Sequence, residues 1–473
     1  MNTNQDLSTK ILPDHLASFV EKMQNDGLDS EIIDSFTYYY RKVVNHEKGF
    51  IHDKDIIPVK PEEIPDLNGL KDYAEAGEKV MNQTVMIVLN GGLGTSMGLT
   101  GPKSLIKIKH DKTFLEFKME DSKNLGIKLV LMNSFRTHEK TLSTIHQMGI
   151  KNQVDFPLSF LQYKFPKINR HDLSPAVWPK DPSLEWNPPG HGDIYSALFS
   201  SKMIHKLLAQ NIRYAFISNS DNLGARVDKS LLGYFSKNDF PFLMEVTQRR
   251  PLDAKGGHLA KHKNGRLILR EIAQCPEEES EAFQDINKYR FFNTNNLWID
   301  LVFLKDYVSK YKRIYLPLIL KPGKLDPRDD LSPDIFQVET AMGAAISMFD
   351  GASAVKVSKA RFMPVKGHND LLAIWSDCYM IKKNKGLVPD PARENMLPIS
   401  ISLDPEFYRK IDMFFDRFKD GPPSLLQCES LTVKGNIFFE KDVKIIGKVH
   451  IENTKDTPAV IPKGTVVKHD IWI

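Results

Sequence analysis

A glycine-rich stretch behind an apolar run constrains this chain more than any other feature. Residues 84–104 read TVMIVLNGGLGTSMGLTGPKS. The apolar, β-branched start predicts a short strand buried on both faces in a parallel sheet. Glycines at positions 91, 92, 94 and 98 permit positive φ and close approach to a ligand, so backbone N–H groups can face phosphate oxygens. Lys103 adds a cation at the end of the loop, and the stretch therefore predicts a polyphosphate site.

Two familiar glycine loops do not fit this stretch. It has no GxxxxGK followed by Ser or Thr, and GGLGTSMG misses the spacing of the dinucleotide motif GxGxxG. A strand-to-helix turn without a ligand is the alternative. Many turns use one glycine and few use four, which favours a binding loop.

The loop resembles the L-x-G-G-x-G-T-x-x-G-x-x-x-P-K signature of nucleotidyltransferases that make nucleotide sugars. Its detail, LNGGLGTSMG followed by GPKS, is similar to the UTP-glucose-1-phosphate uridylyltransferase family, also called UDP-glucose pyrophosphorylases. The related UDP-N-acetylhexosamine enzymes usually carry Arg-Leu where Ser96 and Met97 stand, so this difference favours the glucose family. The resemblance implies a Rossmann-like α/β nucleotidyltransferase domain with a mixed, mainly parallel sheet. It also implies a C-terminal left-handed β-helix and Mg²⁺ as cofactor.

Length and composition narrow the class of protein. A chain of 473 residues is expected to form at least two domains. The net charge of +4 comes without a basic tract, so nucleic acid is not an expected partner. The N-terminus lacks a signal-peptide core and no apolar run reaches the ~18 residues of a membrane span, which predicts a soluble, cytoplasmic protein without a membrane partner. Three distant cysteines without a CxxC motif indicate neither a disulfide framework nor a zinc site.

Strand and helix patterns alternate behind the N-terminal part of the chain. Two helices come first, one from Leu16 to a stop at Gly27 and one with Ser30 as N-cap. The alternation then predicts a parallel α/β sheet, with strands at 84–90, 127–133 and 159–162 and helices at 113–124 and 137–148.

Ligands of such sheets lie beyond the carboxyl ends of the strands, which makes Asn133, Ser134 and Gln162 candidates. Ordinary turn chemistry explains Asn133 and Ser134 equally well. Gln162 matches the Phe-x-Gln segment of the resembled family, which implies a contact with uracil.

The segment WNPPGHGDIYSALF at 186–199 is the second strong signal. Its prolines and glycines predict a rigid turn that presents His191 just before a helix starting near Asp193. A single histidine is more often structural than functional. Because the segment resembles the family's Pro-Pro-Gly-His-Gly, however, the match implies that Gly190 contacts uracil and His191 contacts the sugar phosphate.

Two further strands end in polar residues. The strand at 213–219 is followed by Asp221, whose carboxylate suits Mg²⁺ but equally suits the cap of a turn. The family match over residues 219–222 favours the metal and adds Asn219 to the substrate site. Asn293 and Asn295 alternate along a predicted strand at 291–300, so both should point to one face and bind hydroxyl groups. The resemblance assigns that segment to the glucose moiety, and a polar strand edge is the alternative.

The remaining part of this region contains a hairpin signal, two helix signals and a candidate lysine. Asn264-Gly265 predicts a hairpin after a strand at 242–249. Ser332-Pro333 predicts the start of a long helix with Ile335, Val338 and later apolar residues inward, and the segment from Asp370 predicts a second helix through DLLAIWSDCYMI. Lys366 would ordinarily be solvated. The resemblance to the family's Pro-Val-Lys segment before Asp-Leu-Leu implies a catalytic lysine that bonds the nucleotide phosphates.

A change of periodicity marks the C-terminal part. A helix at 405–418 and the GPP at 421–423 precede two series of apolar residues that recur at every sixth position. The series are Leu431, Ile437, Val443 and Val449, and Val433, Phe439, Ile445 and Ile451. They predict a hexapeptide β-helix, and an antiparallel meander is the alternative. The uncovered end of such a stack favours a homo-oligomer, and a weaker contact or a monomer is the alternative.

Together these features predict three parts: a helical cover over 1–83, a catalytic domain over 84–403, and a linker with the β-helix over 404–473. The resemblance implies an enzyme that makes UDP-glucose and pyrophosphate from UTP and glucose 1-phosphate. Lys103 and Lys366 would be catalytic. A pyrophosphorylase of broader sugar choice and a non-catalytic nucleotide-binding regulator are the rival functions. The phosphate-binding residues are expected to be Leu89, Asn90, Gly91, Gly92, Lys103, Asp221 and Lys366.

Overall fold

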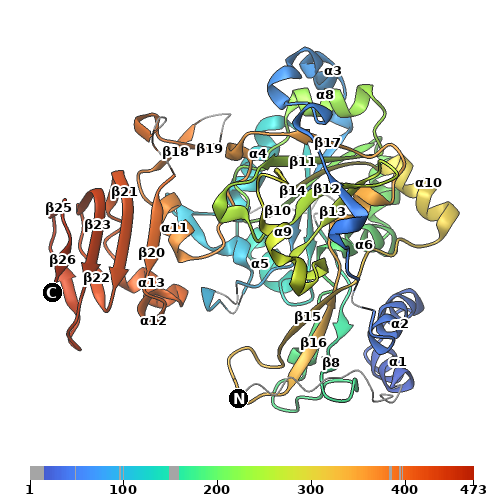
Figure 1. The fold of residues 1–473 in the computed structure, drawn as a ribbon, viewed down its shortest axis with the longest axis horizontal. Coiled ribbons are helices and arrows are strands. Elements are labelled where there is room, and N and C mark those ends of the chain that lie inside the picture. Colours follow the sequence, from blue (N-terminus) through green and yellow to red (C-terminus); the bar gives the residue numbers. More distant parts are fainter. Residues whose placement is uncertain are drawn as a thin grey trace. The chain divides into compact units, whose positions relative to one another are not determined.

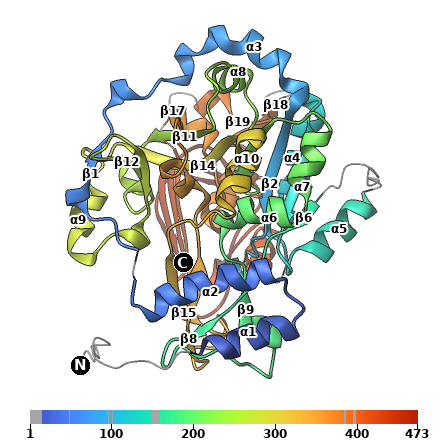
Figure 2. The same cartoon turned by 90° about the vertical axis from the view of Figure 1, so that its right-hand side faces the viewer.

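The computed structural model describes residues 15–47, 49–94, 97–99, 101–148, 159–382, 386–393, 396 and 398–473 (Figures 1 and 2). The chain forms two compact units. The first unit consists of Met1–Asp72, Ser159–Ala215 and Gly233–Val357, and the second of Tyr73–Leu158, Phe216–Leu232 and Ser358–Ile473.

The second unit contains the glycine-rich stretch. The buried strand β2 (Thr84–Asn90) pairs in parallel with β5 (Lys128–Asn133), as the apolar run predicted. Helix α4 (Phe114–Leu125) begins with a capping box between Thr113 and Glu116 and ends at Gly126, whose φ is 65°. The alternating pattern predicted this parallel pairing, and the mixed, mainly parallel α/β fold that the resemblance implies is confirmed.

The other elements of the second unit are as follows. Its helices are α3 (Ala74–Lys79), α5 (His138–Gln147), α11 (His368–Trp375), α12 (Pro405–Tyr408) and α13 (Ile411–Arg417). Its strands up to the C-terminal stack are β3 (Lys107–Lys109), β4 (Lys112–Thr113), β18 (Tyr379–Lys382) and β19 (Gly386–Pro389). Strand β10 (Tyr214–Asn219) and helix α8 (Lys229–Lys237) cross the division between the units.

The first unit is built on β14 (Phe291–Asp300), which pairs antiparallel with β11 (Phe242–Gln248). Strand β11 also pairs in parallel with β17 (Ser353–Lys356), so the sheet is mixed. Strands β12 (His258–His262) and β13 (Leu267–Arg270) form the hairpin that Asn264-Gly265 predicted, and Gly265 has a φ of 88°.

Helices α1 (Leu16–Asn25) and α2 (Ser30–Val44) lie side by side in this unit, with Phe19 and Phe36 in ring contact (Figure 2). The N-cap of α2 is Asp29, and Ser30 is the first helical residue. The remaining helices are α6 (Ile194–Ser200), α7 (Met203–Ala209), α9 (Ser280–Gln284) and α10 (Leu301–Tyr311). The remaining strands are β1 (Ile56–Pro58), β6 (Ser159–Leu161), β7 (Phe165–Pro166), β8 (Ile168–Asn169), β9 (Trp186–Asn187), β15 (Ile319–Lys324) and β16 (Asp334–Glu339).

The long helix predicted from Ser332 is wrong. Residues 334–339 form β16, which pairs antiparallel with β15 and with β8, and a 3₁₀ segment follows at Met342–Ser347. The Ser332 hydroxyl donates to the Asp329 carbonyl and accepts from the Asp326 N–H inside the hairpin loop. Pairing with strands distant in sequence thus overrides the helix-like spacing of the apolar residues.

Two other predicted helices are shorter than expected. The helix expected at 405–418 is divided into α12 and α13. Helix α11 ends at Trp375, and the second half of its predicted range forms β18, paired with β19. The helix predicted at 405–418 thus has the expected outer bounds but is interrupted after Tyr408, whereas the helix predicted from Asp370 ends earlier than expected.

The C-terminal strands β20 (Ser400–Leu403), β21 (Ser424–Lys434), β22 (Ile437–Phe439), β23 (Lys444–Glu452), β24 (Ala459–Ile461), β25 (Val466–Val467) and β26 (Ile471–Trp472) form a stack, shown in red in Figure 1. Leu431 lies opposite Val449 and Val433 opposite Ile451, so one layer follows the next after three six-residue steps. All strand pairs described in this stack are parallel, which excludes the antiparallel meander. Both six-residue series are buried.

Each described helix falls short of the combination of length and apolar character that a bilayer span requires.

Candidate active site

The residues predicted for the site fall into two groups, one in each unit. The second unit contains Leu89, Asn90, Gly91, Gly92, Lys103, Asn219, Asp221 and Lys366. The first unit contains Gln162, Gly190, His191, Asn293 and Asn295. The structure brings residues together within each group.

The glycine loop leaves the end of β2 and is closed by its own backbone. Leu93 and Pro102 form an antiparallel bridge, and the Lys103 N–H donates to the Gly92 carbonyl at 3.2 Å. Gly98 has the predicted positive φ of 70°, whereas a Cβ at Gly94 would lie 2.1 Å from the Leu99 side chain. Backbone conformation therefore explains Gly98, while a Cβ at Gly94 would require the Leu99 side chain to move. Ser96, whose identity separated the two families, lies outside the described residues.

Polar side chains at the strand ends fix this loop from behind. The buried Asn90 amide donates to Asn133 Oδ1 at 2.7 Å and to Thr141 Oγ1 at 3.0 Å. The Ser134 hydroxyl donates to the Gly91 carbonyl at 2.9 Å. Asn133 and Ser134 thus hold the loop in place. This structural role agrees with the alternative that ordinary turn chemistry explains both residues.

Lys103 and Asp221 form an ion pair in the second unit. The Lys103 ammonium lies 2.6 Å from Asp221 Oδ2, and the two side chains are only 15% and 17% exposed. Asn219 lies two residues before Asp221, half-buried at the end of β10. No cluster of three or more His, Cys, Asp or Glu side chains suited to a metal occurs in the part of the chain that the structure describes. The Asp221 carboxylate could supply one ligand to a hard divalent cation, whose other ligands would be phosphate oxygens and water.

The segment that carries Lys366 lies against the segment that carries Asp221. The Val365 N–H donates to the Asp221 carbonyl at 3.2 Å, and Asn222 and Pro364 form an antiparallel bridge. Backbone N–H groups of Lys366 and Gly367 donate to Asp370 Oδ2 at 2.7 and 3.1 Å. The Lys366 side chain is exposed. The structure therefore places Lys103, Asp221 and the Lys366 segment together, as their assignment to the reacting phosphates requires.

In the first unit, Gly190 occupies a position that only glycine fits. Its φ is 79°, and a Cβ there would lie 2.4 Å from the Thr340 carbonyl oxygen. The Gly192 N–H donates to that carbonyl at 2.9 Å, and the Thr340 N–H donates to the Pro189 carbonyl at 2.8 Å. The turn before α6 is thus held against residue 340 on both sides, and His191 is presented from a fixed backbone.

His191 is oriented as a neutral hydrogen-bond donor. Its Nδ1 accepts the Met342 N–H at 3.0 Å, which leaves the ring proton on Nε2. Burial lowers the pKa of His191 to about 4, so the ring is uncharged at neutral pH. Nε2 lies 3.5 Å from Asn295 Nδ2. Because both nitrogens carry protons in this tautomer, neither accepts from the other, and both can donate to a ligand oxygen.

Asn293 and Asn295 are neighbours for a reason that strand alternation did not supply. The Asn293 amide donates to Asn295 Oδ1 at 3.0 Å, and the Asn295 N–H donates to Asn293 Oδ1 at 2.9 Å. Asn295 has a φ of 57°, and the register of β11 and β14 shifts between Glu245 and Val246. A β-bulge therefore turns Asn295 toward Asn293 and His191.

Sequence reasoning missed Asp193, which joins two predicted segments. This buried carboxylate follows His191 by two positions and accepts the Tyr163 N–H, directly after Gln162, at 2.6 Å. It thereby ties the segment of Gln162 to the turn of Gly190 and His191. Asp370 was also missed, although an acidic residue in the first turn of a predicted helix is a recognised capping signal.

A model of the UTP–glucose-1-phosphate uridylyltransferase family matches residues 33–446 of the chain. The chain belongs to this family. A UTP–glucose-1-phosphate uridylyltransferase of Solanum tuberosum is 38% identical over 84% of this chain and 82% of its own length. A probable UTP–glucose-1-phosphate uridylyltransferase of Schizosaccharomyces pombe is 33% identical over 96% of this chain and 90% of its own length.

Solved structures of uridylyltransferases agree with this assignment. A UDP-glucose pyrophosphorylase of Leishmania major, crystallised with UDP-glucose, superposes with a TM-score of 0.86 at 39% identity and covers 97% of this chain and 100% of its own. A UDP-glucose phosphorylase of Trypanosoma brucei superposes with a TM-score of 0.87 at 40% identity, over 97% of this chain and 99% of its own. Members of the family are nucleotidyltransferases, and their reaction joins UTP and glucose 1-phosphate to give UDP-glucose and pyrophosphate.

The buried carboxyl of Asp193 should make the stability of this protein depend on pH. Burial raises the pKa of Asp193 to about 7, well above the ~3.9 of an unfolded aspartate. The neutral carboxyl is therefore favoured on folding. Its contribution is complete below about pH 4 and is lost as the pH rises toward 7.

Asp193→Asn keeps a side-chain acceptor for the Tyr163 N–H but does not ionise. We expect the difference in Tm between the variant and the parent to shift in favour of the variant as the pH rises from 5 to 8. The shift corresponds to at most a few kcal/mol in the free energy of unfolding. Differential scanning fluorimetry across this range provides the measurement. A Tm difference that does not change with pH contradicts the assignment.

Proposed function

We propose that this chain makes UDP-glucose by direct transfer, without a covalent enzyme intermediate. A phosphate oxygen of α-D-glucose 1-phosphate attacks the α-phosphorus of UTP, a new P–O bond forms, and the bond to the β-phosphate bridging oxygen breaks with release of pyrophosphate. The reverse reaction follows the same path. The observation that carries the proposal is the grouping of Lys103, Asp221 and the Lys366 segment behind a family-type glycine loop. Direct transfer needs mainly positioning and charge stabilisation, which these groups supply.

Each group of site residues has a proposed role. In the second unit, Leu89, Asn90, Gly91 and Gly92 would face the UTP phosphates through their backbone, while Lys103 and Lys366 neutralise charge. In the first unit, Gln162 and Gly190 would bind uracil. The neutral donors His191, Asn293 and Asn295 would bind glucose 1-phosphate. Asn219, which belongs to the second unit, is proposed as a further substrate-binding residue. Neutral imidazole and amide groups can form hydrogen bonds with the sugar hydroxyl groups and with the phosphate of glucose 1-phosphate that reacts.

We propose Mg²⁺ as the divalent cation and Asp221 as the residue that holds it. When bound, the cation would neutralise phosphate charge. Support comes from the chemistry of the donor: a single partly buried carboxylate beside a phosphate-binding lysine. Lys103 forms an ion pair with this carboxylate. Its side chain would turn to the phosphates of UTP when UTP binds.

The sugar specificity is tested by pyrophosphate release. The full chain is assayed with UTP, Mg²⁺ and, in turn, the 1-phosphates of glucose, galactose and N-acetylglucosamine. We expect release with glucose 1-phosphate and at most weak release with the other two. Comparable rates with all three would replace the proposal by a pyrophosphorylase of broad sugar choice, and no release with any would leave a nucleotide-binding regulator.

Asp221→Asn tests the metal assignment. We expect lower activity together with a higher Mg²⁺ requirement, because an amide oxygen lacks the negative charge that a hard cation prefers. Activity is titrated with Mg²⁺ at fixed UTP for the variant and the parent. If both titrate alike, Asp221 is a turn residue and the metal binds elsewhere.

For the C-terminal part we propose a left-handed β-helix that forms a homo-oligomer contact at its free end. The parallel pairings eighteen positions apart support a helical stack. The exposed Val460 and Trp472 on its last strands support an uncovered end. Light scattering by the full chain at the mass of a single chain, 54.0 kDa, would contradict the oligomer.

We also propose the three parts at 1–83, 84–403 and 404–473 and a cytoplasmic location.

A further inference from the structure

A lysine of α4 is buried inside the second unit. Lys118 is 1% exposed, and its ammonium donates to the carbonyls of Asn222 and Ala225, each at 2.7 Å. Burial lowers the pKa of Lys118 to about 8, against the opposing effect of Asp121 and Asp221. A lysine is almost never fully buried unless paired, so its position needs a reason.

The two carbonyls belong to the loop 221–226, which follows β10. Helix α4 makes a second contact with this loop, an ion pair between Asp121 and Arg226 at 2.8 Å. On the opposite side, Asn222 Oδ1 accepts the Met363 N–H at 2.9 Å, and a Cβ at Gly224 would lie 2.2 Å from the Ala360 carbonyl oxygen. The loop is thus enclosed between α4 and the segment 360–364.

This loop begins with the groups assigned to the reacting phosphates. Asp221 contacts Lys103 through its carboxylate and Val365 through its carbonyl, directly before Lys366. A displacement of the loop therefore moves Asp221 and the backbone of Lys366 together. Placement errors of about 1 Å at reacting groups can lower a rate about 10²-fold.

We infer that Lys118 is a positioning residue, which fixes loop 221–226 on α4 and thereby sets the place of Asp221 and of the Lys366 segment. The inference rests on the proposed transfer of a uridylyl group. It concerns a residue that touches no substrate and acts through the backbone carbonyls that it binds. Substrate contacts in the first unit are not affected.

The test replaces the ammonium by an apolar group of similar length. Lys118→Met should lower kcat about 10- to 100-fold, while the KM for UTP changes less than about threefold. Hydrogen–deuterium exchange of the peptide over 221–226 should be faster in the variant, which reports the loop without an activity assay. Lys118→Gln, which keeps a shorter polar group, should lie between the variant and the parent in both measurements.

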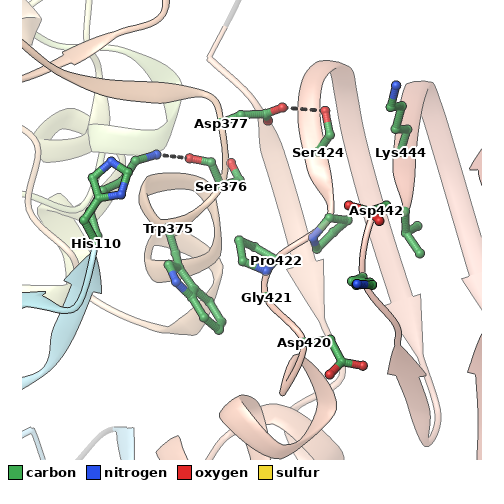
Figure 3. A pocket seen from close by; sticks show the side chains of 14 residues that line it. His110, Trp375, Ser376, Asp377, Asp420, Gly421, Pro422, Ser424, Asp442 and Lys444 are labelled. Carbon is green, nitrogen blue, oxygen red and sulfur yellow. Dashed lines mark hydrogen bonds between the residues drawn. The ribbon is translucent and has the colours of Figure 1, made fainter. Parts of the chain in front are cut away.

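Lys109 provides a matched control. It is 8% exposed, and its ammonium donates to the carbonyls of Ile374 and Ser376 at the end of α11. It borders a cavity of about 490 Å³ whose walls include Trp375, Ser376 and Asp442 (Figure 3). Lys109→Met should lower the Tm as Lys118→Met does, but leave kcat within about twofold and exchange at 221–226 unchanged.

The outcomes separate the inference from the proposed function. Failure of the parent to form UDP-glucose removes the proposed function. With an active parent, a folded Lys118→Met or Lys118→Gln that keeps both the kcat and the exchange rate of the parent overturns the inference. The same holds if Lys109→Met lowers kcat as much as Lys118→Met, because the loss would then follow from general destabilisation.

Discussion

Lys366→Ala should lower kcat about 10²- to 10³-fold and change the KM for UTP much less. The backbone N–H of residue 366 is bound by Asp370, and its side chain is exposed, so removing the side chain leaves the fold intact. A cation that acts on charge developing in the transition state stabilises that state more than the bound substrate, and its loss therefore appears in kcat. Steady-state kinetics with varied UTP measure the two constants separately.

Two other lysine variants serve as comparisons for Lys366→Ala. Lys444→Ala removes another exposed lysine of the second unit, on the wall of the cavity in Figure 3, and should leave kcat within about twofold. Lys103→Ala should lower kcat and also raise the KM for UTP, because Lys103 is a partly buried cation of the phosphate loop and contributes to ground-state binding. A parental kcat in Lys366→Ala would remove Lys366 from the catalytic assignment.

Local sequence signals predicted those features that depend on short-range chemistry. The apolar run and the glycines identified β2 and its loop, because a buried parallel strand and a close backbone turn each restrict residue type over a few positions. The six-residue series predicted the C-terminal stack, because a repeated period records the layer spacing directly in the sequence.

Other features depend on partners far away in the sequence. Ile335 and Val338 fit a helix by spacing, but pairing with β15 makes the segment a strand. Asn295 faces Asn293 because of a bulge whose position depends on the register with β11. Asp193 and Lys118 bind backbone groups 30 and more than 100 positions away, respectively. Nothing in the local sequence distinguishes them from surface charges.

Deleting residues 421–473 should prevent the second unit from folding, although it removes no residue of the proposed site. The C-terminal stack shares one continuous apolar core with the rest of this unit, from Phe114 and Leu371 to Leu431 and Ile451. Phe418 stacks on Phe439 with ring centroids 5.0 Å apart, and the Tyr408 hydroxyl donates to the Ile437 carbonyl at 2.6 Å.

Removing the stack would expose this core to water, and each large apolar side chain that loses its cover costs about 1.5–3 kcal/mol. Because proteins are stable by only about 5–15 kcal/mol, a few such losses suffice for unfolding. We therefore expect the chain that ends at Asp420 to be insoluble or to lack a cooperative thermal transition. An independent C-terminal domain would instead leave the remaining chain folded.

A milder pair of variants in the full chain tests the same point. Phe439→Ala should destabilise the unit by about 3–5 kcal/mol, because it opens a cavity in a fully buried part of the core. Trp472→Ala removes a side chain that is 66% exposed and should leave the Tm nearly unchanged. A truncated chain that is soluble, melts at the Tm of the parent and binds UTP in calorimetry would contradict the shared core and make the stack a separable domain.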